Sequence, residues 1–143
     1  MKPYEHILVA TDFSALAEVA LRRALGLAGS ARLTILHVVE HFPEDIPAEQ
    51  ISPEDVDPTQ FIRNQAQQRL NATAETVHAE MAVLKVVMST GSARAAIAEE
   101  AGREKVDLIV VGANGGGTMS GLLGSTATGV SQSAACDVLV VRG

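Results

Sequence analysis

The sequence predicts a single α/β domain spanning residues 1–143, built as a doubly wound, five-stranded parallel sheet with helices on both faces. Three observations lead to this prediction. The 143 residues are the length of one ordinary domain. Short apolar runs alternate along the chain with segments of helical periodicity, which is typical of strand–helix–strand units. Aromatic residues make up only 3% of the chain and Trp is absent, so the core must be aliphatic, as in a buried parallel sheet.

The first strand and helix have clear expected boundaries. Residues 7–10 form a short apolar run that ends at Thr11, as buried strands do. Ser14 is placed to cap the following helix, and Gly29 is placed to end it with a positive φ. A second strand is expected at residues 33–39. The predicted inward face of the helix carries Leu16, Ala17, Ala20, Leu21, Ala24, Leu27 and Ala28.

An acidic, proline-bearing loop is expected at about residues 40–58. Its four prolines are too closely spaced for regular structure. No Lys or Arg occurs between Arg32 and Arg63, whereas Asp and Glu are frequent there. A solvated surface loop is one interpretation, and a docking site for a basic partner is the other.

The remaining segments continue the alternation of helix and strand. A helix is expected over residues 59–82, with Ile62, Ala66, Leu70, Ala74 and Val77 inward, before a strand at residues 83–88. A helix over residues 92–104, with Ala95, Ala96, Ile97 and Ala101 inward, precedes a strand at residues 107–111. The last helix is expected at residues 125–134 and the last strand at residues 138–141. Right-handed crossovers then give a parallel sheet, whose ligands lie beyond the carboxyl ends of the strands where the strand order reverses.

Charge and composition exclude several classes of function. The net charge of −6 argues against nucleic-acid binding, which needs a basic face to displace counterions. No stretch approaches the roughly 20 apolar residues that span a bilayer, so membrane insertion is not expected. The single cysteine, Cys136, allows no internal disulfide and suits a reducing compartment. No signal-peptide pattern precedes the first strand, and a cytoplasmic protein is therefore expected.

The strongest candidate for a binding site is the glycine-rich segment at residues 112–126. Its six glycines lie between an expected buried strand and an expected helix. Glycine lets the backbone point successive N–H groups at one anion, and the start of the helix attracts a phosphate. Neither a P-loop motif nor the dinucleotide G-x-G-x-x-G pattern is present. From spacing alone, a flexible surface loop with Ser125 or Thr126 as a plain N-cap remains the alternative.

Four separated blocks of the sequence resemble the universal stress protein family, in the same order. They are residues 7–14, residues 36–39, residues 106–125 and residues 136–141. The third block is similar to the family's G-x-x-G-x9-G-[ST] nucleotide loop. The resemblance covers nearly the whole chain and implies an adenine nucleotide alpha hydrolase-like fold, ATP binding and commonly a homodimer.

The same resemblance implies which residues meet the nucleotide. Ala10, Thr11 and Asp12 match positions near the base and ribose, and Val38 matches a position whose backbone meets the adenine. The positions that hold ribose and phosphates match Gly112, Gly115, Gly124, Ser125 and Thr126. The predicted site for ATP, or another adenine nucleotide, consists of these residues together with Asn114 and Gly117.

The loop departs from the family pattern in two ways. Eight residues separate Gly115 from Gly124, one fewer than in the commonest form. No Lys or Arg occurs between Lys105 and Arg142, whereas many members carry a basic residue in this loop. Phosphate charge would then be met by N–H groups, the helix dipole and Mg²⁺. Asp12 could contact that metal or a ribose hydroxyl, or it could cap the first helix locally.

Other reactive residue types have simple structural interpretations. His37 lies in an apolar strand, where a hydrogen-bonded core histidine is commoner than a catalytic one. Cys136 reads as a small buried apolar residue. The histidines lack metal-ligand spacing and no serine lies in a nucleophile elbow, so no catalytic residue is predicted.

The last strand bears on assembly. If Val138, Leu139, Val140 and Val141 form an edge strand, their open backbone groups favour pairing with a second copy. The resemblance implies the same homodimer, and a strand covered by its own helices is the alternative. Three functions stay open: a dimeric ATP-binding regulatory protein of the stress response, a nucleotide-free interaction module, and a slow Mg²⁺-dependent ATPase. Rapid hydrolysis is not expected because no general base can be identified.

Overall fold

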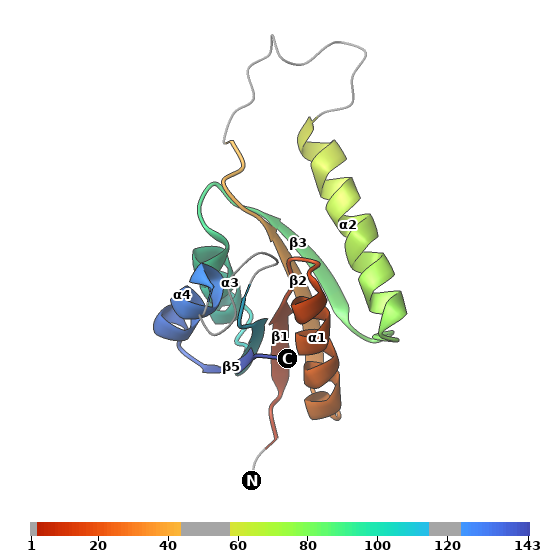
Figure 1. Ribbon diagram of the computed structural model, residues 1–143, viewed down its shortest axis with the longest axis vertical. Coiled ribbons are helices and arrows are strands. Elements are labelled where there is room, and N and C mark those ends of the chain that lie inside the picture. Colours follow the sequence, from red (N-terminus) through yellow and green to blue (C-terminus); the bar gives the residue numbers. More distant parts are fainter. Residues whose placement is uncertain (1–2, 44–57, 115–123) are drawn as a thin grey trace.

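The computed structural model describes residues 3–43, 58–114 and 124–143, which form one parallel sheet covered by helices (Figure 1). The strands are β1 (His6–Ala10), β2 (Arg32–Val39), β3 (Val83–Met88), β4 (Leu108–Gly112) and β5 (Asp137–Val141). The helices are α1 (Ala15–Ala28), α2 (Pro58–Thr76), α3 (Ala93–Arg103) and α4 (Ser125–Ser133). All neighbouring strands pair in parallel, in the order β3-β2-β1-β4-β5. The predicted doubly wound, five-stranded parallel sheet is confirmed.

Side-chain alternation along the strands divides the core between the two faces of the sheet. In β1, Ile7 and Val9 pack with α1 and α2, whereas Leu8 packs with α3 and α4. All three side chains are fully buried. Figure 1 shows α1 and α2 on one side of the sheet and α3 and α4 on the other. A central strand that is buried on both faces has to be apolar throughout, which is why residues 7–10 lack polar alternation.

The start and end of α1 follow local hydrogen bonding. Ser14 Oγ accepts a hydrogen bond from the Ala17 N–H at 3.2 Å, so Ser14 is the N-cap as predicted. Gly29 ends the helix with a φ of 56°, a value that strongly favours glycine. Both predictions are confirmed.

The predicted end of α2 at residue 82 is wrong, because the helix ends at Thr76. His78 has a φ of 59°, and its N–H donates to the Glu75 carbonyl at 3.2 Å. The Ala79 N–H donates to the Ala74 carbonyl at 2.9 Å. These two bonds form a Schellman motif, which normally carries glycine at the left-handed position. Histidine stands there instead, so composition alone gave no signal for the end of the helix.

Two residues assigned to inward helix faces are exposed. Leu27 is 50% exposed because it lies at the margin of the apolar stripe of α1, in the last turn. Ala95 is exposed because it lies opposite buried Ile97 and Glu100 around α3. The buried face of α3 instead includes Glu100, a residue that the apolar pattern did not identify.

Candidate functional site

A pocket of about 530 Å³ lies beyond the carboxyl ends of the strands, where β1 and β4 diverge. From β1 the chain moves outward through β2 and β3, and it then returns to add β4 and β5 on the other side. Ligands of open α/β sheets bind at this point of reversal, and the volume lies in the usual range for small-molecule sites. Among the predicted site residues, the pocket lining includes Ala10, Thr11, Asp12, Val38, Gly112, Asn114, Gly124, Ser125 and Thr126. Gly115 and Gly117 lie outside the described residues.

The turn after β1 forms one wall of the pocket. The Thr11 N–H donates to the Leu36 carbonyl at 2.8 Å, which continues the pairing of β1 with β2 past the end of the strand. Thr11 Oγ1 accepts from the Phe13 N–H at 3.0 Å. Asp12 Oδ1 accepts from the Ser14 N–H at 3.0 Å, just before α1 begins. Asp12 therefore supports the start of α1 locally, as the capping alternative predicts, and it also faces the pocket.

Phe13 stabilises this turn from the side of α2. Its φ of 66° is unusual for a bulky residue. Its ring stacks on the His37 ring with centroids 4.3 Å apart, and the Arg69 guanidinium lies 4.2 Å from the Phe13 centroid. His37 Nδ1 donates to the Thr11 carbonyl at 2.8 Å. These contacts match the expectation of a hydrogen-bonded structural histidine.

Two of the helices that begin at the pocket are capped by side chains of the chain itself. Ser14 caps α1, and Ser92 Oγ accepts from the Ala95 N–H of α3 at 3.4 Å. A second hydrogen bond caps the start of α3, because its Ala93 N–H donates to Glu40 Oε2 at 2.8 Å. This carboxylate therefore occupies the positive end of the α3 dipole.

Helix α4 begins differently. Its N-cap residue is Gly124, which has no side chain to cap it, and no side-chain hydrogen bond to this helix start is present in the described structure. Ser125 and Thr126 lie inside the helix, so the interpretation of either residue as a plain N-cap is wrong. Both residues line the pocket. The first N–H groups of α4 are thus the part of the pocket best suited to an anion.

Close packing explains one glycine at the end of β4. A Cβ on Gly112 would lie 3.2 Å from Leu16 Cγ of α1, a tight contact. Gly112 therefore has a packing role that is independent of any ligand. Just beyond it, the Ala113 carbonyl accepts from the Gly124 N–H at 2.6 Å, and the Ala113 N–H donates to the Val141 carbonyl at 2.8 Å. These bonds fix both ends of the glycine-rich segment beside β5.

The pocket is acidic. Asp12 and Glu40 line it, and no Lys or Arg is among its lining residues in the described ranges. Residues 115–123 also contain no Lys or Arg in the sequence. Glu40 was not among the predicted site residues. Its position directly after β2 could have identified it, because the carboxyl ends of parallel strands share one edge of the sheet.

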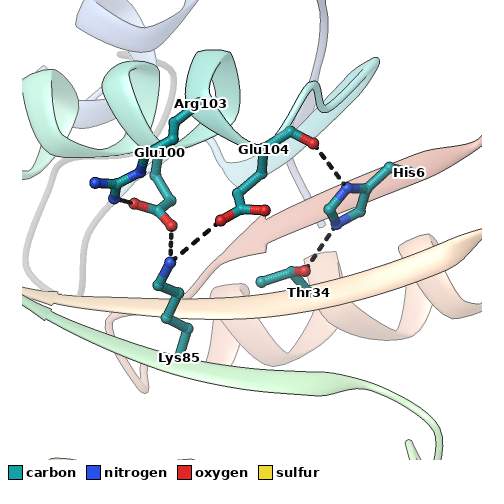
Figure 2. Close-up of polar contacts among 6 residues, drawn as sticks. All are labelled: His6, Thr34, Lys85, Glu100, Arg103 and Glu104. Atoms are coloured by element: carbon teal, nitrogen blue, oxygen red, sulfur yellow. Dashed lines mark hydrogen bonds and ion pairs between the residues drawn. The ribbon is translucent and has the colours of Figure 1, made fainter.

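A second group of charged residues lies away from the pocket, between α3 and the sheet (Figure 2). Glu100 is 1% exposed, and its carboxylate binds both Lys85 from β3 and Arg103 from α3. Lys85 Nζ also lies 3.5 Å from Glu104 Oε1. We call Lys85, Glu100, Arg103 and Glu104 the Lys85 cluster. Burial raises the pKa of Glu100, but the hydrogen bonds from Lys85 and Arg103 lower it by more. The pKa therefore lies below its ordinary value.

His6 lies beside this cluster and is fully hydrogen-bonded. Its ring nitrogens contact the Glu104 carbonyl at 3.3 Å and Thr34 Oγ1 at 2.8 Å (Figure 2). In the described parts of the chain, no three His, Cys, Asp or Glu side chains gather to hold a metal ion. Cys136 is half-buried, and burial together with nearby Asp137 raises the pKa of its thiol.

Strand β5 occupies one edge of the sheet, with β4 as its neighbour. Val138, Leu139 and Val140 are half-buried, whereas Val141 is buried. The edge position is as predicted, and α1 and α4 both contact this strand. None of the helices in the described ranges has the length and apolar character needed to cross a bilayer.

Comparison with known sequences shows the family of the chain. A model of the universal stress protein family matches residues 3–142. The chain is 34% identical over 140 residues to universal stress protein A homolog 1 of Coxiella burnetii, covering 96% of both proteins. It is 33% identical to homolog 2 of the same organism, covering 99% of this chain and 97% of the relative.

Solved structures give the same result. The universal stress protein UspA from Lactobacillus plantarum aligns with a TM-score of 0.69 and 30% identity, covering 99% of this chain and 100% of that chain. A universal stress protein solved in complex with cAMP aligns with a TM-score of 0.71 and 26% identity, covering 99% of both. A universal stress protein from Archaeoglobus fulgidus, solved with dAMP, shares the fold at 20% identity and a TM-score of 0.67, covering 99% of this chain and 100% of that chain.

Proposed function

Since the chain belongs to the universal stress protein family, we propose that it binds an adenine nucleotide in the pocket between β1 and β4. The observation that carries this proposal is the composition of the pocket wall. Residues from the ends of β1, β2 and β4 meet the start of α4 there, and no described side chain caps that helix. A relative with 26% identity was solved with cAMP, which supports the same ligand class.

The expected contacts follow from the chemistry of the wall. The Val38 and Thr11 side of the pocket would hold the base and ribose, and the first N–H groups of α4 would meet a phosphate together with Ser125 and Thr126. Asp12 could contact Mg²⁺ or a ribose hydroxyl. Occupancy would change the glycine-rich segment and thereby the contacts of a regulatory protein of the stress response. No general base can be identified from the sequence, so at most slow hydrolysis of ATP is expected.

Calorimetric titration with AMP, cAMP, ADP and ATP tests this proposal directly. Gly124→Gln should abolish binding, because its side chain would enter the space in front of α4. The backbone of Gly124 has a φ of −68°, which glutamine also adopts. Gly102→Gln is the matched control, since a Cβ there has nothing within 4 Å and Gly102 lies outside the pocket. Flat titrations of the unmodified protein with every nucleotide would refute the proposal.

One observation favours a second function, a nucleotide-free interaction module on the same fold. The pocket carries two carboxylates and no lining cation among the residues whose positions are described. On this hypothesis, protein freshly purified from cells contains no nucleotide after denaturation, as measured by mass spectrometry. Adenine nucleotides would then also leave the melting temperature unchanged.

Assembly and location are proposed on separate grounds. The edge position of β5 supports a homodimer in which Val138, Leu139, Val140 and Val141 pair with a second copy. Sedimentation equilibrium at micromolar concentrations should give twice the chain mass, and a monomer would contradict this assembly. A cytoplasmic location is supported by the single cysteine and is testable by cell fractionation.

A further inference from the structure

The charges around the pocket indicate a narrower ligand class than adenine nucleotides in general. We infer that the pocket selects an adenine nucleotide with a single phosphate, as monoester or cyclic diester, over one with a triphosphate. This inference rests on the proposed function, because it concerns the same pocket.

Three helices begin at the pocket, and the N-terminus of each carries partial positive charge. At the start of α3, the Ala93 N–H donates to the Glu40 carboxylate at 2.8 Å and the Ala95 N–H donates to Ser92 Oγ. The turn into α1 is bonded to Asp12 and Ser14. Of α1, α3 and α4, which all begin at the pocket, α4 is the one without a side-chain cap among the described residues. A helix start carries about half an elementary charge, which suits one phosphate group better than three.

A polyphosphate in the pocket would meet two carboxylates of the same sign of charge. Asp12 and Glu40 both line the pocket, and each is anchored by one oxygen to a backbone N–H. They therefore cannot swing away without leaving that N–H without its acceptor. Each further phosphate adds about one negative charge to the ligand. Repulsion from these two carboxylates thus rises with the length of the phosphate chain.

Two arginines lie close to this end of the fold without lining the pocket. The Arg69 guanidinium lies over the Phe13 ring at 4.2 Å. The stem of Arg94 packs against α4, where a Cβ on Gly129 would lie 2.9 Å from Arg94 Cβ. Neither arginine is among the lining residues in the described structure. The compensation that a triphosphate needs would therefore have to come from backbone N–H groups, Mg²⁺ or another partner.

The decisive experiment is a set of calorimetric titrations of the full chain with cAMP, AMP, ADP, ATP and adenosine in EDTA. Affinity should fall with phosphate charge, with AMP binding at least about tenfold more tightly than ATP. Adenosine should bind more weakly than AMP, because it cannot contact α4. Raising the salt concentration from about 50 to about 500 mM should narrow the gap between AMP and ATP, since salt screens repulsion.

Charge-removing variants identify the source of the selectivity. Asp12→Asn combined with Glu40→Gln keeps acceptor oxygens for the Ser14 and Ala93 N–H groups. This double variant should raise the affinity for ATP several-fold more than the affinity for AMP. Glu75→Gln combined with Glu99→Gln removes the same number of charges from exposed residues outside the pocket and should leave the ratio unchanged.

The possible results separate this inference from the proposed function. Binding of ATP as tightly as AMP in EDTA would overturn the inference and leave nucleotide binding intact. An unchanged AMP-to-ATP ratio in the double variant would also overturn it, as would adenosine binding as tightly as AMP. If no adenine compound binds at all, the proposed function itself fails.

Discussion

The Lys85 cluster and the pocket hold their carboxylates in opposite ways. In the Lys85 cluster, buried Glu100 is paired with a lysine and an arginine. At the pocket, Asp12 and Glu40 are bonded to backbone N–H groups, and no cation lines the wall in the described ranges. The cluster holds α3 against the sheet, where an unpaired buried charge would be unfavourable. The pocket leaves negative charge facing solvent, where it can influence which ligand enters.

The largest expected effect comes from breaking the Lys85 cluster. Lys85→Met removes one of the two cations on Glu100, whose side chain is almost completely buried. We expect a loss of about 3 kcal/mol in the free energy of unfolding, because a buried carboxylate loses a charged partner. Urea denaturation followed by circular dichroism measures this loss.

A double variant separates the charge effect from a simple packing effect. Lys85→Met with Glu100→Met replaces the pair by apolar side chains of similar size. This variant should be more stable than Lys85→Met alone, since the unpaired charge is gone. If both variants are equally unstable, the cluster acts through packing. Charge pairing would then not distinguish the cluster from the pocket.

The pH dependence of stability also tests the role of Glu100 in the Lys85 cluster. The pKa of Glu100 is lower in the folded protein than its ordinary value, although burial opposes this shift, because Lys85 and Arg103 donate hydrogen bonds to it. A depressed pKa stabilises the fold above the unfolded-state pKa, and this stability is lost as the pH falls through the folded-state value. Glu100→Gln should therefore lose stability at neutral pH and depend less on pH in the acid range. Urea midpoints between neutral and acid pH measure this, and a variant curve parallel to the wild type would contradict it.

A smaller effect is expected from the helix packing that positions the start of α4. A Cβ on Gly129 would overlap the stem of Arg94 on α3. Gly129→Ala should lower the free energy of unfolding by about 1–2 kcal/mol, because the two helices must separate or Arg94 must move. Gly26→Ala in α1 is the matched control, since nothing lies within 4 Å of its Cβ. The control should gain about 0.5 kcal/mol from helix propensity, as measured by thermal and urea denaturation. Equal effects at both glycines would show that packing of α3 on α4 is loose.

The contrast between the two regions also explains what the sequence could predict. The strands and most helix boundaries followed from apolar runs and from caps such as Ser14 and Gly29. The pocket residues were predictable because parallel strands end at one edge, so Thr11 and Gly112 had to meet. The end of α2 was not predictable, because histidine occupies a left-handed position that usually carries glycine.

The Lys85 cluster was missed for a different reason. Lys85 and Glu100 are 15 residues apart, and they meet only through the stacking of α3 on the sheet. Each residue alone resembles a solvent-exposed charge. The sequence did contain a signal, since a lysine inside an apolar strand and a glutamate on the buried stripe of the next helix require one another. Glu40 carried a similar signal through its place at the end of β2, but its bond to the start of α3 depends on tertiary structure.

The smallest effect is expected at Arg69, whose guanidinium lies against the turn after β1. Arg69→Ala removes the guanidinium from the Phe13 ring and leaves the His37 stack in place. Because this contact is partly exposed, we expect a loss of only about 0.5–1 kcal/mol in the free energy of unfolding. Arg63→Ala, at an exposed arginine of the same helix, should change stability less. Nucleotide affinity should stay within about twofold of the wild type in both variants, since neither residue lines the pocket. A selective loss of ATP affinity in Arg69→Ala would show that this arginine supplies positive charge to the pocket. The contrast between the Lys85 cluster and the pocket would then have to be revised.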